Sequence, residues 1–282
     1  MTRHIDRRRE TIGGCSTIVL GLIAMTAEAE TRSAAWCESR WHELSDQHLT
    51  SKPPNYGALL HSWRELEPQC TGTGVYEARL ATIHAVQKDF AAAQKVLSPV
   101  ETVAPEYAAL LDAARLQVAF EQQLAEDPQQ ARIAEFGPRF AKLIADAPSW
   151  YVAHELNATY LLVSGEPARA IEASRRALEA EPTSWWSYRI MTIAYSELGE
   201  HRTAAEMGDR THGMHSTVSA DPDFMLALAR SYVAIGDRKM SETVLSLLFT
   251  YRPEVRQTSQ YRETLIFVRN ALGSSAGQSP AR

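Results

Sequence analysis

The spacing of glycines and prolines between residues 151 and 255 constrains the fold more than any other feature of the chain. Gly165 is followed 34 residues later by Gly199, and Gly236 follows after a further 37 residues. Pro182 stands 17 residues after the first of these glycines, and Pro253 stands 17 residues after the last. A period of about 34 residues with such turn signals is typical of stacked helical hairpins. The sequence therefore predicts a helical solenoid in this region.

The composition supports helices along the whole chain. Its 282 residues are 45% hydrophobic, which is enough for a substantial core. Alanine, leucine, glutamate and arginine dominate, and the apolar residues mostly recur with a helical period. The formal net charge is −5, from 29 basic and 34 acidic residues. An acidic chain of this kind argues against a nucleic-acid partner or an anionic membrane as the main target.

Residues 1–29 have the pattern of a targeting segment. Arg3 and residues 7–9 are basic, residues 12–25 are mostly apolar, and Ala27-Glu28-Ala29 matches a cleavage site. The apolar run is shorter than the roughly 20 residues that span a membrane comfortably. We therefore expect cleavage after Ala29, a periplasmic or secreted location, and no membrane insertion after cleavage. An uncleaved N-terminal membrane anchor is the alternative.

Two cysteines outside the targeting segment fit export to an oxidising compartment. Cys37 lies near the start of a helical pattern over residues 33–48, and Cys70 lies just past the end of the next pattern, over residues 55–67. In an antiparallel hairpin these two ends are neighbours. We expect a Cys37–Cys70 disulfide, which would close the first hairpin. Two unrelated reduced thiols are the alternative.

The segment Tyr151–Ala220 resembles two tetratricopeptide repeats, and Pro222–Val255 resembles a third. In that family, small residues occupy repeat positions 8 and 20, an aromatic residue occupies position 11, and proline occupies position 32. Residues 151–184 supply Ala158, Gly165, Ala170, Ala177 and Pro182; residues 185–218 supply Tyr195, Gly199 and Ala204; residues 222–255 supply Ala229, Tyr232, Gly236, Leu248 and Pro253. The first of these repeats departs from the pattern at Leu161, where tyrosine is usual, and at Ser174, where a large apolar residue is usual. The second lacks the small residue at Thr192 and the proline at Ser216.

The resemblance implies an all-α fold, a right-handed superhelical solenoid of about five or six antiparallel hairpins over residues 30–272. Residues 74–105 are interpreted as a divergent repeat, and residues 106–147 as two long helices broken near Asp127 and Pro128. Residues 36–68 form the first hairpin in this interpretation, and residues 260–272 a capping helix. Residues 273–282 are rich in glycine and serine, and we expect a disordered tail there.

The same resemblance implies a concave groove lined by the first helix of each hairpin. Its candidate partner-binding residues are Glu155, Thr159, Leu162, Trp186, Arg189, Ile193 and Arg230. Apolar and charged side chains mixed in this way would suit an extended peptide or a helix. Of the adjacent Trp185 and Trp186, we expect one in the core and the second exposed as an anchor. In the alternative interpretation, both tryptophans simply fill space between repeats.

No residue pattern indicates catalysis or a cofactor. A G-x-S-x-G match at residues 273–277 lies in the expected tail, without the strand and helix that a nucleophile elbow needs. The sequence therefore favours a non-enzymatic scaffold of the cell envelope that binds a protein or peptide and helps to assemble a larger complex. Self-association is one alternative. A metal protein or enzyme using His212, His215 and Glu206 is another.

Overall fold

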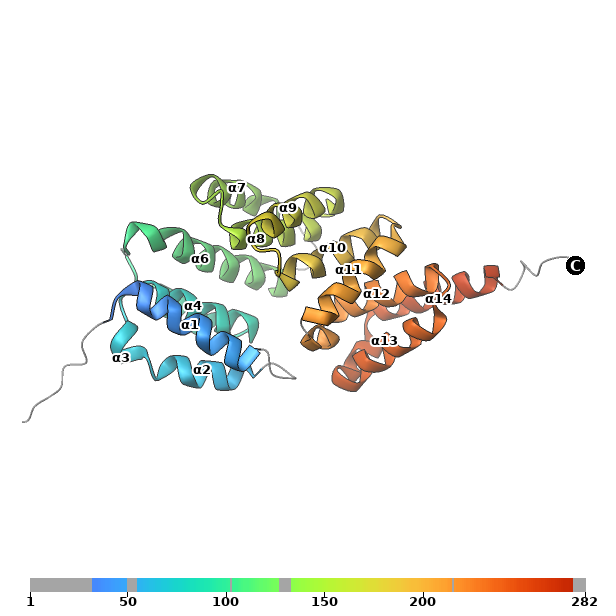
Figure 1. The fold of residues 1–282 in the computed structure, drawn as a ribbon, viewed down its shortest axis with the longest axis horizontal. Helices are drawn as coiled ribbons and strands as arrows, with labels where there is room; N and C mark the ends of the chain where they lie inside the picture. Colours follow the sequence, from blue (N-terminus) through green and yellow to red (C-terminus); the bar gives the residue numbers. More distant parts are fainter. Residues whose placement is uncertain (1–31, 50–54, 102, 127–132, 215, 276–282) are drawn as a thin grey trace, which may run out of the picture. The chain divides into compact units, whose positions relative to one another are not determined.

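The computed structural model describes residues 32–49, 55–101, 103–126, 133–214 and 216–275. These ranges form fourteen α-helices and short 3₁₀ turns joined by loops (Figure 1). No helix within them is long and apolar enough to cross a membrane. The expected targeting segment and its cleavage site lie outside the described residues.

The N-terminal part contains five helices, which are α1 (Ala34–Leu49), α2 (Tyr56–Arg64), α3 (Glu67–Cys70), α4 (Val75–Val86) and α5 (Phe90–Leu97). The predicted disulfide is present: Cys37 in α1 and Cys70 in α3 are bonded, with Cα atoms 5.9 Å apart, and both are fully buried. Trp63 packs beside them, with Trp41 at 5.3 Å and Tyr76 at 5.5 Å between ring centroids. The bond thus belongs to an aromatic core.

One boundary in this part differs from the sequence-based expectation. Cys70 was expected just past a helix over residues 55–67, but α2 ends at Arg64 and Cys70 closes the separate short helix α3. Pro68 stands in the first turn of α3, where its missing N–H has no intrahelical partner to lose. The chain therefore makes two helical segments where the sequence pattern suggested one.

The middle of the chain contains α6 (Pro105–Glu126), a 3₁₀ turn (Ile133–Phe136) and α7 (Gly137–Asp146). The expectation of two long helices is correct for α6 and wrong for α7, which has only ten residues. Phe120, Phe136, Phe140 and Tyr160 gather into one aromatic cluster here, with Phe140 and Tyr160 stacked at 5.2 Å. This cluster joins α6 and α7 to the hairpin that follows.

Three complete hairpins and a last helix follow. They are α8 (Tyr151–Val163) with α9 (Pro167–Ala180), α10 (Trp185–Glu197) with α11 (His201–Met214), α12 (Pro222–Ala234) with α13 (Arg238–Tyr251), and α14 (Ser259–Ser275). Gly165, Gly199 and Gly236 end the three first helices with φ of +74°, +77° and +88°. This left-handed backbone is where glycine is favoured after a helix. The three first helices begin at Tyr151, Trp185 and Pro222, the residues at which the sequence analysis began the three repeats.

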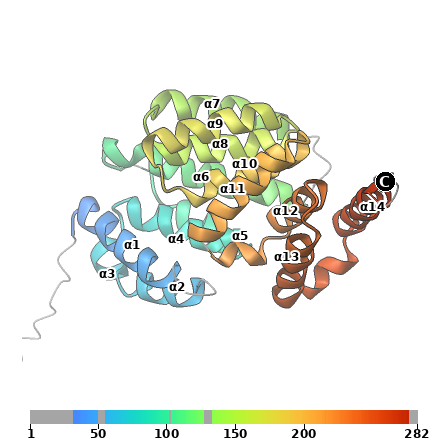
Figure 2. The same cartoon turned by 45° about the vertical axis from the view of Figure 1, so that its right-hand side comes forward.

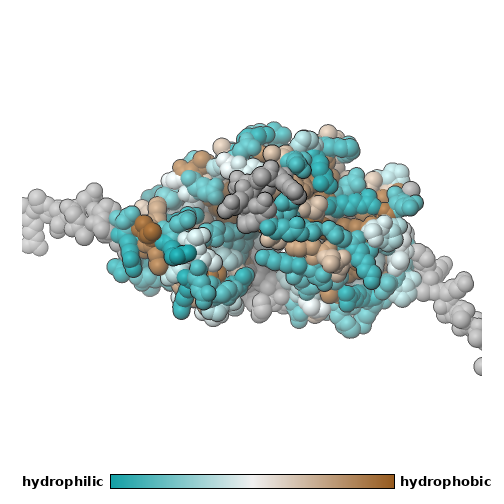
Figure 3. Space-filling view, turned by 180° about the vertical axis from the view of Figure 1, so that it is seen from behind, coloured by the Kyte–Doolittle hydropathy of each residue, from teal (hydrophilic) through white to brown (hydrophobic). Residues whose placement is uncertain are grey.

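Each helix packs mainly against its hairpin partner and against helices of the adjacent hairpins. Figures 1 and 2 show the α8–α9, α10–α11 and α12–α13 pairs following one another along the array. The described part of the chain is therefore an all-α solenoid of antiparallel hairpins. Figure 3 shows one face of it, which is mainly hydrophilic with small separate hydrophobic areas.

The last helix is longer than predicted. It was expected over residues 260–272, with the tail beginning at residue 273, but α14 continues to Ser275. The first three residues of the G-x-S-x-G match therefore belong to a helix end, and residues 276–282 lie outside the described part. α14 packs against α12, and Gln260 Nε2 donates to Asp223 Oδ1 at 2.7 Å. It occupies the place of the first helix of a further hairpin.

Candidate partner-binding groove

The seven groove residues predicted from the sequence lie on the first helices α8, α10 and α12. Four of them are half-buried, namely Thr159, Leu162, Trp186 and Arg230. The remaining three are buried, namely Glu155, Arg189 and Ile193. The expectation that all seven offer side chains to a partner therefore needs correction for these three, because adjacent repeats enclose them. Partner binding by the four half-buried residues stays a prediction.

The carboxyl of Glu155 in α8 is hydrogen-bonded to the N-terminus of α10, the first helix of the next hairpin. Its Oε1 accepts hydrogen bonds from the hydroxyls of Ser184, the N-cap of α10, and Ser187, the latter at 3.2 Å. Ser184 Oγ in turn accepts from the Ser187 backbone N–H at 3.1 Å. Burial raises the pKa of the Glu155 carboxyl to about 7, although the two hydroxyl donors favour the ionised form. This carboxyl is a structural junction between two repeats.

Arg189 makes the corresponding contact one repeat later. Its Nε donates to Asp221 Oδ2, and the Oδ1 of the same carboxylate caps α12 by accepting from the Phe224 N–H at 3.2 Å. The Arg189 guanidinium also lies 4.7 Å from the ring centroid of Trp186. Because a buried guanidinium needs its ion-pair partner, Arg189 is committed to this internal network.

The two tryptophans differ from the expectation of one core and one exposed ring. Trp185 and Trp186 are both half-buried, and their rings meet edge to face with centroids 5.2 Å apart. Trp186 Nε1 donates to Thr159 Oγ1 at 3.1 Å. The amphipathic indole thus fills space between α8 and α10 and uses its polar edge within the chain. Trp186 is a wall of the groove rather than a free anchor.

Arg230 is the groove residue with an available charge. It is half-buried, its Nε is buried without a hydrogen-bond partner, and no carboxylate among the described residues lies within ion-pair distance of it. Two titratable groups lie near it, Glu197 and His201. Burial raises the pKa of Glu197 while Arg230 lowers it, and burial and Arg230 together lower the pKa of His201.

Sequence reasoning missed both of these neighbours. Glu197 ends α10 and His201 begins α11, on either side of the turn at Gly199. His201 Nδ1 lies 3.4 Å from Ser231 Oγ, and its ring packs against Phe267 of α14 at 5.6 Å. The repeat pattern names only first-helix positions as groove residues, so it gives no signal for side chains at the turn.

The metal alternative has no support in the described part of the chain. No group of three or more histidine, cysteine, aspartate or glutamate side chains is arranged there to hold an ion. His212 Nε2 lies 3.3 Å from Ser219 Oγ, and its ring packs on Phe224 at 5.3 Å. Burial lowers the pKa of His212. Glu206 is exposed on α11, and His215 lies outside the described residues.

Comparison with known proteins found similarity only among solved structures. No protein-family model and no curated protein sequence matches the chain. A thermophilic TPR protein from Thermus thermophilus is 14% identical, with a TM-score of 0.46, covering 71% of this chain and 98% of that one. A structure of MamA is also 14% identical, with a TM-score of 0.41 and coverages of 64% and 98%.

A third solved structure is the C-terminal part of a TPR repeat-containing protein from Cytophaga hutchinsonii. It is 11% identical, with a TM-score of 0.36, and covers 83% of this chain and 99% of that one. The description of this chain as a TPR-like solenoid rests on its own hairpins, their glycine ends and the packing between consecutive pairs.

Proposed function

We propose that this chain is a non-catalytic scaffold of the cell envelope that binds a protein or peptide in the groove formed by α8, α10 and α12, and so helps to assemble a larger complex. The observation that carries the proposal is the guanidinium of Arg230. A half-buried arginine without a carboxylate partner in the described residues is costly unless something supplies one. A partner carboxylate would satisfy it.

The rest of the groove supports a polypeptide ligand. Thr159, Leu162 and Trp186 add half-buried polar and apolar surface along the first helices. Arginine and aromatic side chains are the residue types that contribute most to protein interfaces. The envelope location is supported by the basic and apolar pattern of residues 1–29 and by the Cys37–Cys70 bond, since disulfides persist in oxidising compartments.

The proposal is tested by comparing two arginine substitutions. A photoreactive residue at Asp223, which is exposed beside the groove, captures the partner in native cells, and the purified partner is then titrated against variants. Arg230→Ala is expected to weaken binding at least tenfold, because a charge-assisted contact is lost. Arg202→Ala, an exposed arginine on α11, is the matched control and should bind normally. Equal affinity of the two variants would refute the groove assignment.

Self-association is a second candidate, and one exposed residue favours it. Ile266 in α14 is 59% exposed, whereas the residues at the same repeat position, Ala158, Thr192 and Ala229, are fully buried by the second helix of their own hairpin. A helix from a second copy could cover this place. Light scattering should then report a dimer that Ile266→Glu converts to a monomer, and a monomeric wild type would exclude this candidate.

A further inference from the structure

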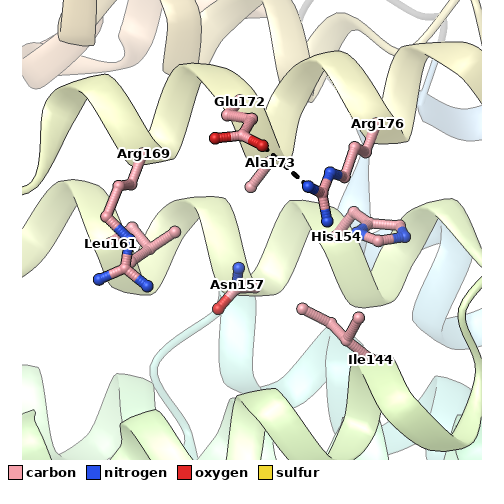
Figure 4. Close-up of a pocket in the computed structure, with 8 residues that line it drawn as sticks. All are labelled: Ile144, His154, Asn157, Leu161, Arg169, Glu172, Ala173 and Arg176. Atoms are coloured by element: carbon pink, nitrogen blue, oxygen red, sulfur yellow. Dashed lines mark hydrogen bonds and ion pairs between the residues drawn. The ribbon is translucent and has the colours of Figure 1, made fainter.

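A trough crosses α8 between α7 and α9. Two adjoining cavities of about 140 Å³ and 390 Å³ share the lining residues Ile144, Asn157, Leu161 and Arg169. Figure 4 shows Leu161 and Asn157 on α8, with Ile144 extending toward them from α7 and Arg169 from α9. The trough is open to solvent and its walls are a mixture of apolar and polar side chains.

The trough coincides with a missing tyrosine. Leu161 stands at repeat position 11, where the next two repeats have Tyr195 and Tyr232, each buried. Both tyrosines reach the second helix of the preceding hairpin: Tyr195 Oη accepts from Arg175 Nη2 at 2.8 Å, and the Tyr232 hydroxyl donates to Asp209. Leucine is too short for this contact.

Leu161 instead packs toward α9, where Ala170 and Ala173 are its neighbours. Gly137, Ala141 and Ile144 of α7 line the larger cavity, and a Cβ on Gly137 would stand 2.7 Å from the Tyr160 hydroxyl. The ring of Tyr160 stacks on Phe140 of α7. At this junction Tyr160, at position 10, makes the contact with α7, and the two cavities remain beside Asn157 and Leu161.

A second departure makes the floor of the trough polar. Repeat position 7 is Met191 in one later repeat and Leu228 in the other, both buried, but it is Asn157 in the first. Leu228 lies so close to Gly208 of α11 that a Cβ there would stand 2.5 Å from its Cδ1. The Asn157 amide is half-buried and has no hydrogen-bond partner among the described residues. It can donate or accept.

The charges around the trough are already compensated. Arg169 pairs with Glu166, and Arg176 pairs with Glu172 at 2.8 Å. An anionic or cationic ligand would find no excess of opposite charge at these walls. An uncharged ring with a hydroxyl group, of the kind that Tyr195 and Tyr232 place at the equivalent sites, matches the apolar walls and the free amide.

We infer that this trough binds a tyrosine side chain of a partner polypeptide, inserted where the following repeats place a tyrosine of their own. Asn157 would hydrogen-bond the phenol hydroxyl, and Ile144, Leu161 and Ala173 would contact the ring. This surface is distinct from the concave groove, because residues two apart on a helix point about 200° apart and Asn157 and Leu161 follow Glu155 and Thr159 by two. It adds a second binding surface to the proposed scaffold.

The first test uses 4-fluorophenol as an analogue of the tyrosine side chain, observed by ¹⁹F NMR. The wild-type protein should bind it saturably with a millimolar dissociation constant, as a small fragment does. Leu161→Tyr, which fills the trough as the next repeats do, should weaken binding roughly tenfold or more. No saturable binding by the wild type, or undiminished binding by Leu161→Tyr, would overturn the inference.

A second variant tests whether weaker binding by Leu161→Tyr comes from a filled trough or from a folding defect. Ala141→Met narrows the same trough from the exposed surface of α7 and should also weaken binding, with an unchanged circular dichroism melt. Tyr195→Leu opens the equivalent space between α9 and α10 and should add a second site for the probe. Arg230→Ala should leave probe binding unchanged, which separates this surface from the groove; loss of binding in that variant would place the probe elsewhere.

A crosslink connects the trough to a polypeptide. A photoreactive residue at Ala141, in native cells, should capture a partner peptide that contains tyrosine at or next to the crosslinked position. The Leu161→Tyr change should remove this crosslink while the crosslink from the groove persists. A captured segment without an aromatic residue, or a crosslink that survives Leu161→Tyr, would overturn the assignment of the occupant.

Discussion

Replacing Glu155 by glutamine should remove a pH-dependent cost to folding. Burial raises the pKa of this carboxyl from 4.5 to about 7 in the folded protein, where the residue is only 9% exposed. Above pH 4.5 the unfolded chain releases the proton, while the folded chain keeps it up to about pH 7. Stability is therefore lost as pH rises through this window, by about 3 kcal/mol in full. Glutamine avoids the loss and its Oε1 can still accept from Ser184 and Ser187.

The assay is urea unfolding of the wild type and of two variants at about pH 5 and pH 8. Glu155→Gln should be close to the wild type at the lower pH and more stable than it by up to about 3 kcal/mol at the higher pH. Glu179→Gln, on the exposed side of α9, is the control and should follow the wild type at both values. Taking differences between variants cancels the titration of all other groups. Identical pH dependence in wild type and Glu155→Gln would refute the reasoning.

Three further predictions concern stability and use denaturant unfolding. Cys37→Ser opens a disulfide between residues 33 apart in sequence and should cost about 3–4 kcal/mol, a loss that reductant reproduces in the wild type. Asp221→Ala removes both the cap of α12 and the partner of the buried Arg189, and should cost about 3–5 kcal/mol, whereas Asp221→Asn keeps the cap and should cost less. Gly208→Ala places a methyl group 2.5 Å from a buried leucine of α12 and should destabilise by about 1 kcal/mol or more, while Gly213→Ala in the same helix meets no atom within 4 Å and should stabilise slightly.

The hairpins could be predicted because their signals are local. A glycine with left-handed φ ends a helix wherever it stands, as at Gly165, Gly199 and Gly236, and the position depends on a few neighbouring residues. The apolar period of each helix is also visible in a short stretch of sequence. The end of α2 was misjudged for a similar local reason, because Pro68 begins a new helical turn that the apolar pattern does not reveal.

The exposure of the groove could not be predicted, because it depends on partners that are distant in sequence. Glu155 bonds to Ser184, 29 residues on, and Arg189 pairs with Asp221, 32 residues on. The repeat pattern gives the face of the helix on which a residue lies, but it does not give the side chain that the next repeat presents to it. Arg230 is available because Glu197, the carboxylate near it, and the other described carboxylates form no ion pair with it.

Only one part of the trough could be predicted from the sequence. The departure at Leu161 is visible in the sequence, but its meaning depends on what the same position does in the folded neighbours. Only the structure shows Tyr195 and Tyr232 extending to the preceding hairpin, and hence what is missing beside Leu161. A departure from a repeat pattern is thus informative when the structure shows what the residues at the same position of the other repeats contact.

The junctions between the hairpins also determine the order in which the repeats can be joined. At one junction the carboxyl of Glu155 meets a cap made of serine hydroxyls, and at the next the guanidinium of Arg189 meets the carboxylate cap Asp221. Exchanging the two first helices would set Glu155 against Asp221, two acidic groups, and would leave Arg189 facing Ser184. Although the hairpins have the same arrangement of helices, they are not interchangeable. A chain with its repeats in another order would lose stability at the contacts between hairpins, whether or not a partner is bound.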